Sequence, residues 1–410
     1  MKIKRFCIEA YRSCIKTAVP FNAELTSLIG INGAGKSSVL NGIQLLKKSC
    51  RIRYSPIQET EFSTYTCKIS VDIEQGDKCL YLKGRINYDT DEKNTDFVIS
   101  SEIKCNLKDY TGKSEWLVIP IEFVLNFESS HITSDNRMIN HRRWWFNHKY
   151  IEKIVEINRY PLIKEAIELL NSISYYSASQ FSDPSRCPVS IELEDNKPVR
   201  RTRYSTSHDQ FILDLYKSFK ADEVSYKKYI NAVNSNGIGL IDSISFTEVE
   251  MPSSSYEVRS GGKIHKIEKN RLLVVPNINI DGNNLSPNQL SEGTFKTLAL
   301  VYYILTDSSK VLLIEEPEVC IHHGLLSSII ELIKTQSKKK QIIISTHSDF
   351  VLDHLEPDNI VLVKKSEKSG TTVKPLNKYM SKNDYKALKT YLEESGNLGE
   401  YWKEGGFDNE

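Results

Sequence analysis

The sequence lacks the features that mark several common classes of protein. Its eight cysteines are scattered through 410 residues without a Cys-x-x-Cys pair, so neither a zinc site nor a disulfide framework is predicted. No apolar run approaches the length of a membrane-spanning helix, and the first residues suit a strand and lack the apolar core of a signal peptide. We therefore expect a reduced, cytoplasmic protein that has no membrane partner.

An excess of charge of one sign is also missing. Lysine and arginine together number 54, aspartate and glutamate 53, and the net charge is +1. Without a global field that gathers a polyanion, any nucleic-acid site must be local. Residues 137–149 and 200–204 are basic and interleaved with aromatic residues, which suits phosphate contact and base stacking. The same composition suits a packed core, a self-interface or a partner interface, and we favour these over nucleic acid.

Sustained heptads, internal repeats and low-complexity tracts are absent as well, which excludes a long coiled-coil arm and a repeat protein. The length suits one large or two moderate domains. Alternating apolar and polar residues predict antiparallel strands between residues 67 and 127. Helices are predicted over 150–171, 207–234 and 382–394. Three strands are predicted over 243–251, 255–267 and 271–280, with a turn at Gly261 and Gly262.

What the sequence does contain is a phosphate-binding pattern near its start. Residues 30–37 read Gly-x4-Gly-Lys-Ser, between an apolar strand that ends at Ile29 and a predicted helix. The glycines let successive backbone amides point at one spot, and the helix N-terminus adds a positive dipole. Lys36 would reach the β- and γ-phosphates of a nucleotide, while the Ser37 hydroxyl would ligate Mg²⁺. The predicted nucleotide-binding residues of this loop are Asn32, Gly33, Ala34, Gly35, Lys36, Ser37 and Ser38.

Two acids follow a second apolar run. Residues 311–314 predict a buried parallel strand, and Glu315 and Glu316 come directly after it, where open α/β sheets bind their ligands. We expect Glu315 to hold Mg²⁺ through water and Glu316 to polarise the attacking water. A third apolar run, 341–345, brings His347 to the same sheet edge, where a neutral imidazole would contact the γ-phosphate.

The segment Leu290-Ser291-Glu292-Gly293 resembles the signature motif of ABC-type ATPases. With the motifs above, the chain resembles the group that includes the RecF, SMC and OLD proteins. It is most similar to the stand-alone ATPase subunits of bacterial anti-phage systems such as Septu, the retron-associated ATPases and PARIS. The resemblance is strong over residues 1–50 and 285–365 and weak over 51–285. It rests on Glu315–Glu318 with His322, on residues 345–348 and on the Asn-Leu-Gly-Glu segment at 397–400.

The resemblance implies an α/β fold of the P-loop NTPase class, an ABC-type head with a flanking antiparallel β-sheet and an inserted helical lobe. Residues 1–130 would form the N-terminal half of the head. Residues 131–240 would form the mainly helical lobe, and residues 241–410 would form the C-terminal half of the head.

The resemblance also assigns roles to residues outside the phosphate loop. Ser291 and the Gly293 amide would contact the γ-phosphate bound by the other subunit, and Lys296 would point at the same phosphates. A glutamine would sense both Mg²⁺ and the attacking water; Gln180 fits this role best and Gln58 is the alternative. Two residues depart from the usual pattern, since Glu292 stands in the signature and Glu315 stands where aspartate is more common.

Arg12 lies where relatives place a basic residue that contacts the nucleotide. The implied protein binds ATP and Mg²⁺, pairs its heads into a homo-oligomer and hydrolyses ATP slowly. Its implied task is to sense infection or to gate an effector nuclease of a defence complex. Because no room remains for a TOPRIM nuclease domain, that nuclease would be another polypeptide. The alternatives are a DNA-repair or chromosome-maintenance ATPase that clamps duplex DNA, and an assembly scaffold with little hydrolysis.

Overall fold

The computed structural model divides the chain into two compact units, each assembled from segments that are distant in the sequence. The first unit contains Met1–Tyr175, Ser308–Glu316 and Lys334–Glu410, and the second contains Tyr176–Asp307 and Pro317–Ile333. The structure describes residues 1–49, 66–76, 78–90, 97–108, 114–120, 161–194, 197–198, 206–258, 264–394 and 396–407. Gln58 and the basic stretches 137–149 and 200–204 lie outside these residues. Within the described parts of the chain, no helix combines the length and the apolar character needed to cross a bilayer.

A mainly parallel sheet forms the centre of the first unit, in the order β17-β16-β3-β15-β14-β8. Strand β3 pairs in parallel with both β15 and β16, and β15 pairs in parallel with β14. The runs 311–314 and 341–345 are thus confirmed as strands, and their buried residues fit a sheet covered on both faces. The strands are β3 (Leu25–Ile29), β8 (Ser174–Ser177), β14 (Val311–Glu315), β15 (Gln341–Thr346), β16 (Ile360–Ser366) and β17 (Gly370–Pro375).

An antiparallel sheet in the order β2-β1-β4-β5-β6-β7 is the second layer of this unit. It confirms the antiparallel strands predicted between residues 67 and 127 as far as residue 120. The Gln341 side chain joins the two sheets, because it accepts from the Ile3 N–H at 2.9 Å and donates to the Ile3 carbonyl at 2.7 Å. The strands are β1 (Lys2–Tyr11), β2 (Cys14–Pro20), β4 (Thr66–Gln75), β5 (Lys78–Thr90), β6 (Phe97–Lys108) and β7 (Ser114–Pro120).

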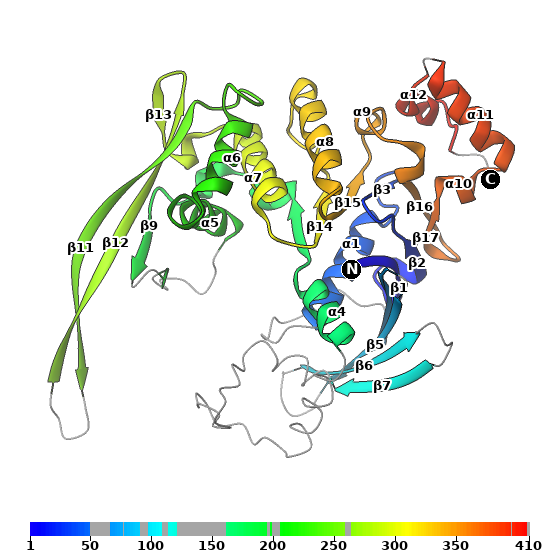
Figure 1. Cartoon of the computed structure of the whole chain (residues 1–410), viewed down its shortest axis with the longest axis horizontal. Helices are drawn as coiled ribbons and strands as arrows, with labels where there is room; N and C mark the ends of the chain where they lie inside the picture. The colour runs from blue at the N-terminus through cyan, green and yellow to red at the C-terminus, as the bar shows by residue number, and fades with distance from the viewer. Residues whose placement is uncertain are drawn as a thin grey trace. The chain divides into compact units, whose positions relative to one another are not determined.

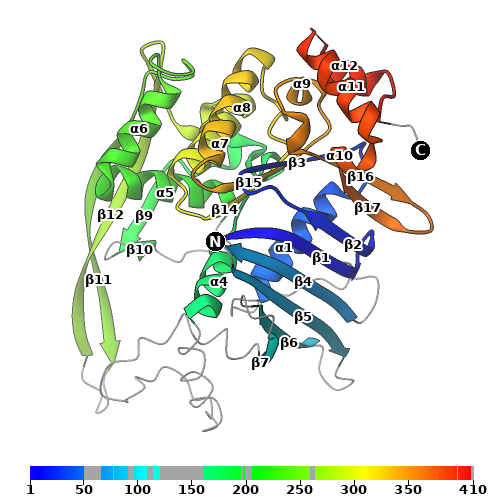
Figure 2. The same ribbon diagram turned by 45° about the vertical axis from the view of Figure 1, so that its right-hand side comes forward.

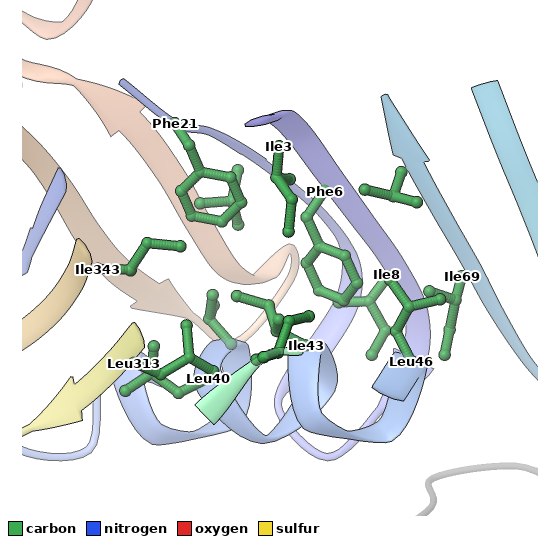
Figure 3. Packing of buried hydrophobic residues seen from close by; sticks show 14 of the residues in the cluster. Ile3, Phe6, Ile8, Phe21, Leu40, Ile43, Leu46, Ile69, Leu313 and Ile343 are labelled. Carbon is green, nitrogen blue, oxygen red and sulfur yellow. The ribbon is translucent and has the colours of Figure 1, made fainter. Parts of the chain in front are cut away.

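Helix α1 (Lys36–Ser49) packs between these two sheets. Figure 3 shows its side chains Leu40 and Ile43 among Leu313 and Ile343 of the parallel sheet and residues of the antiparallel sheet. The other helices of the unit are α4 (Pro161–Asn171), α9 (Asp349–Leu352), α10 (Leu376–Tyr379), α11 (Lys382–Glu393) and α12 (Leu398–Lys403). Burial of α1 on both sides fixes the start of the helix, and with it the phosphate loop.

The second unit combines helices with an antiparallel sheet in the order β10-β9-β12-β11, to which β13 adds. Its helices are α5 (Ser207–Ala221), α6 (Glu223–Val233) and α7 (Glu292–Thr306), while α8 (His323–Ser337) begins in it. Its strands are β9 (Ile191–Glu194), β10 (Lys197–Pro198), β11 (Ser243–Val258), β12 (Ile264–Ile280) and β13 (Asn283–Leu285). It overlaps the predicted lobe 131–240 over residues 176–240.

Two secondary-structure predictions for this unit differ from the structure. The helix expected over 207–234 is divided at Asp222, whose side chain accepts from the Ser225 N–H and caps α6. The three strands expected between 243 and 280 are two long ones, β11 and β12, paired in continuous register from Ser243 to Val258 (Figure 1). Strand β11 includes Pro252 and is an edge strand, the position in a sheet where proline is tolerated.

Candidate nucleotide-binding site

The phosphate loop leaves the buried strand β3 and enters α1, as the sequence predicts. Gly33 and Gly35 adopt positive φ angles of 80° and 105°, a backbone that L side chains rarely adopt. Lys36 is 5% exposed, and its ammonium donates to the carbonyls of Gly30 at 2.7 Å and Ile31 at 3.1 Å. The loop therefore curls around the ammonium group of Lys36, which concentrates positive charge at the N-terminus of α1.

Residues that are remote from the phosphate loop in the sequence pack against it and hydrogen-bond to it. A Cβ added at Gly35 would lie 2.1 Å from Thr371 Oγ1 in β17, so only glycine fits here. Thr371 Oγ1 lies 2.8 Å from Ser13 Oγ and donates to the Ala34 carbonyl at 3.1 Å. Ser13 Oγ in turn donates to Ser38 Oγ at 3.1 Å. Sequence reasoning missed Thr371, because no local pattern marks a threonine that lies over three hundred residues from its partners.

The turn between β1 and β2 carries Arg12. This residue is exposed, has a positive φ of 49°, and its guanidinium lies 5.4 Å from the centroid of the Tyr11 ring. The next residue, Ser13, contacts Ser38 of α1, so the turn lies beside the phosphate loop. This placement is compatible with the predicted contact between Arg12 and a nucleotide.

The acids Glu315 and Glu316 lie at the C-terminal end of β14, next to β15, and β15 is in turn next to the β3 strand that leads into the phosphate loop. The Tyr175 hydroxyl donates to Glu315 Oε2, which restrains one oxygen of this carboxylate. Glu316 has a positive φ of 49°, and its N–H donates to the Ser345 carbonyl at 2.9 Å. A non-glycine residue in this region stores backbone strain, which is typical of functional sites.

His347 follows β15 and lies beside Glu316. Its Nδ1 is 3.6 Å from Glu316 Oε1, and about a third of each side chain is exposed. The structure therefore brings together the carboxylate and the imidazole that the sequence assigns to catalysis. Both are open to a substrate at the edge of the sheet.

The residues after His347 are held by the C-terminus of the described chain. Ser348 caps α9, and α12 contacts the carboxylates of Asp349, the first residue of α9, and of Asp353, the residue after it. The Gly399 N–H donates to Asp353 Oδ1 at 2.7 Å, and the Lys403 ammonium forms an ion pair with Asp349. This hydrogen bond from Lys403 lowers the pKa of Asp349. We call these contacts between α12 and α9 the tail clasp; they give the Asn-Leu-Gly-Glu segment a structural role.

The donor set suits Mg²⁺ held jointly with a nucleotide. Among the described residues, no group of three or more His, Cys, Asp or Glu side chains could hold a metal ion. Mg²⁺ commonly uses one or two protein oxygens together with water and phosphate oxygens. Ser37, exposed in the first turn of α1, and Glu315 are the residues of the first unit that would hold it. Bound Mg²⁺ would neutralise phosphate charge.

The signature residues belong to the second unit. Ser291 is exposed and caps α7 by accepting from the Thr294 N–H at 3.2 Å. A Cβ added at Gly293 would lie 2.6 Å from the Cys320 carbonyl, which explains the glycine. Lys296 is 1% exposed, and its ammonium lies 2.6 Å from Glu292 Oε1. This hydrogen bond from Lys296 lowers the pKa of Glu292. Glu292, the residue that departs from the usual signature, thus pairs with a lysine of the same helix.

Gln180 also belongs to the second unit. It is exposed on the 3-10 helix η2 (Ala178–Phe181). The neighbouring Phe181 ring packs 6.3 Å from the ring of Phe295 in α7, and the Tyr176 hydroxyl donates to the Lys296 carbonyl at 3.1 Å. The structure thus gathers the predicted residues into two sets. The first unit holds the phosphate loop, both acids and His347, and the second holds Gln180 and the signature.

This fold and site define a P-loop NTPase fold with one mainly parallel and two antiparallel sheets. A family model described as "AAA ATPase domain" matches residues 1–245, more than half of the chain, so the chain belongs to that family. A second model, described as "AAA domain, putative AbiEii toxin, Type IV TA system", matches residues 162–353. No curated protein matches the chain.

Solved structures of SMC heads are similar to the chain at low identity. One, an SMC head bound to the C-terminal winged-helix domain of ScpA, is 12% identical with a TM-score of 0.49, covering 93% of this chain and 100% of that one. The SMC head domain from Thermotoga maritima is 12% identical with a TM-score of 0.41, covering 92% and 99%. A Pyrococcus furiosus SMC head, bound to the C-terminal domain of ScpA, is 14% identical with a TM-score of 0.43, covering 96% and 100%.

Proposed function

We propose that this chain binds Mg-ATP and hydrolyses it at sites completed by a second copy of itself. Lys36 and the loop amides bind the phosphates, Ser37 and Glu315 hold Mg²⁺, and Glu316 polarises the attacking water. His347 orients the γ-phosphate, and Gln180 senses the metal and the water. The observation that carries the proposal is the 3.6 Å approach of His347 to Glu316, at the edge of the sheet that carries the phosphate loop.

We propose a partner copy because Ser291 of the signature is exposed. Ser291 is accessible at the N-terminus of α7, a helix of 15 residues whose first amides and dipole favour a bound phosphate. A paired arrangement gives each nucleotide one phosphate loop and one signature from different copies. Lys296 lies in the second turn of α7 and pairs with Glu292, the first residue of that helix. Its positive charge would therefore add to the field that the start of α7 presents to the phosphates.

We further propose that hydrolysis gates a separately encoded effector nuclease in an anti-phage defence complex, and that the protein acts in the cytoplasm. The match of residues 162–353 to a model named for a putative AbiEii toxin supports a toxin-like system. A nuclease gene beside this one, whose protection against phage requires Lys36, would support this role. Protection that survives Lys36→Ala would contradict it.

The nucleotide site itself is tested by Lys36→Ala. The substitution removes the charge that meets the phosphates and should weaken ATP binding by roughly 2–4 kcal/mol, the range for a desolvated charge pair. Isothermal titration measures the affinity. Lys47→Ala, in the same helix, is the matched control, since Lys47 donates to the Ile173 carbonyl away from the loop. Equal ATP affinity in Lys36→Ala and the wild type would remove the assignment.

A further inference from the structure

The net charge of +1 conceals a strong local concentration of lysine near the C-terminus. Residues 364–389 contain eight lysines, two acids and no arginine or histidine, which gives this segment a charge of +6. The rest of the chain therefore carries −5. The segment has only 26 residues, so it produces a positive field that the whole-chain value does not reveal.

These lysines lie on neighbouring elements of the first unit: the β16–β17 hairpin, α10 and α11 (Figures 1 and 2). Lys382 and Lys386 are four residues apart in α11 and therefore share a helix face. Lys374 pairs with Leu362 in the hairpin, so it shares a sheet face with Lys364. We call the exposed members of the group the C-terminal basic surface: Lys365, Lys368, Lys374, Lys378, Lys382 and Lys386.

The charge of this surface is not neutralised by the described residues. Lys364 contacts the Tyr379 hydroxyl and Lys389 forms an ion pair with Asp358 at 2.9 Å, and these two are the half-buried members of the group. None of the six exposed lysines forms an ion pair within the described part of the chain. Their mutual repulsion opposes folding, and an external polyanion would relieve it.

We propose that the C-terminal basic surface binds the phosphate backbone of duplex DNA without regard to sequence. Lysine binds phosphate as a point charge, and contacts to the phosphate backbone carry no sequence information. Single strands are held by stacking on aromatic rings. Among the described residues, the elements that carry the six lysines have one exposed large hydrophobic side chain, Tyr391, which is 38% exposed. The surface therefore offers little for the bases of a single strand to stack on.

Other partners fit this surface less well. Protein interfaces are depleted in lysine and enriched in tryptophan, tyrosine and arginine. Stable anchoring to a membrane requires an apolar or lipid signal in addition to basic residues. The inference goes beyond the proposed ATPase activity, since these lysines lie outside the residues assigned to the nucleotide.

The test replaces Lys378, Lys382 and Lys386 together by glutamine, which keeps the side-chain length and removes three charges. Fluorescence anisotropy with a short duplex of mixed sequence gives the affinity over a series of salt concentrations. The wild type should bind with a steep salt dependence. In the triple variant the slope of log affinity against log salt should become shallower by about 0.9 for each lysine that contacts a phosphate.

A matched control removes Lys217, Lys227 and Lys228, three exposed lysines of the second unit, by the same substitution. This control should retain the wild-type affinity and slope. The inference is overturned if the wild type does not bind the duplex, if both triple variants lose the same affinity, or if a single strand binds more tightly than the duplex. It is also overturned if the first variant loses binding to phosphatidylserine vesicles and keeps its DNA affinity.

ATP hydrolysis without DNA separates this inference from the proposed function. Both triple variants should hydrolyse ATP like the wild type. Lys36→Ala should bind the duplex with unchanged affinity. If the chain binds DNA and does not hydrolyse ATP, the inference about the basic surface is retained and the ATPase proposal is wrong. If the chain hydrolyses ATP and does not bind DNA, the ATPase proposal is retained and the inference about the basic surface is wrong.

Discussion

At the scale of single residues, the two adjacent acids have different surroundings. Glu315 accepts a hydrogen bond from Tyr175, whereas Glu316 faces His347 from a strained backbone. Glu316→Gln keeps the shape of the side chain and removes its basicity, so hydrolysis should fall by roughly 10²-fold or more. Phosphate release and ATP binding are the measurements, and ATP binding should persist.

The companion variant Glu315→Gln should weaken the dependence of ATP binding on Mg²⁺. If Glu315→Gln stopped turnover with Mg-ATP still bound, and Glu316→Gln hydrolysed normally, the roles of the two acids would be exchanged.

The two glycines of the phosphate loop differ in what surrounds them. A Cβ at Gly35 would meet Thr371 and Ser13, whereas a Cβ at Gly33 would have nothing within 4 Å. Gly35→Ala should therefore lower the free energy of unfolding by more than the roughly 1–3 kcal/mol that backbone strain alone costs, and Gly33→Ala by no more than the strain. Thermal unfolding of the two variants measures the difference. Equal loss would show that Thr371 does not constrain the loop.

Sequence patterns point to the candidate residues of this site and do not point to the residues that support them. Lys36, Glu316 and His347 each follow a strand in a recognisable local pattern, and parallel strands bring their ends to one edge. Thr371 and Tyr175 support the loop and an acid from distant strands, so no local pattern marks them. The left-handed backbone of Glu316 is set by the Ser345 carbonyl, a contact that depends on the pairing of β14 with β15.

At the scale of elements, the tail clasp predicts a dependence of stability on pH. The Lys403 hydrogen bond lowers the folded-state pKa of Asp349 from its usual 3.8. The contribution is therefore present above pH 3.8 and is lost as the pH falls through the lower folded pKa. Lys403→Gln should lower the thermal midpoint slightly at neutral pH, since exposed pairs contribute little.

The difference between the variant and the wild type should vanish at the acid end of the series. Lys382→Gln, another exposed lysine of the same unit, is the control and should show no such change. A difference that stays constant down to the lowest pH at which the chain is folded would exclude an ionised Asp349 as its source.

Helices and strands could be predicted where a local sequence pattern determines them, and could not where a tertiary contact determines them. The buried strands β14 and β15 appear as plain apolar runs in the sequence. Helices α5 and α6 looked like one helix because Asp222 resembles an exposed helical residue until its capping contact is known. The sequence pattern predicts a break between residues 251 and 255, whereas β11 continues through Pro252 at the edge of its sheet, where proline is tolerated.

At the scale of the whole molecule, the paired site predicts complementation. Ser291→Arg places bulk and charge where a neighbour's γ-phosphate should dock, so each copy should bind ATP and hydrolysis should stop. Mixing this variant with Lys36→Ala should restore part of the activity, because one of the two mixed sites keeps both an intact loop and an intact signature. Phosphate release from mixtures measures it.

The informative control is proof that mixed dimers form, obtained with two affinity tags. Full activity of Ser291→Arg alone would show that one chain completes its own site. Absence of rescue in verified mixed dimers would show the same.

The order of the strands along the chain in the first unit has a consequence for biosynthesis. Strand β3 leads into the phosphate loop within the first thirty residues, yet its sheet neighbours β15 and β16 begin at Gln341 and Ile360. A ribosome makes the loop first and its neighbours last, so the emerging N-terminal segment must wait for most of the chain before this sheet can form. We therefore expect that the nucleotide site cannot form on a chain interrupted before residue 341, and that the unpaired N-terminal segment exposes apolar surface of the kind that chaperones bind.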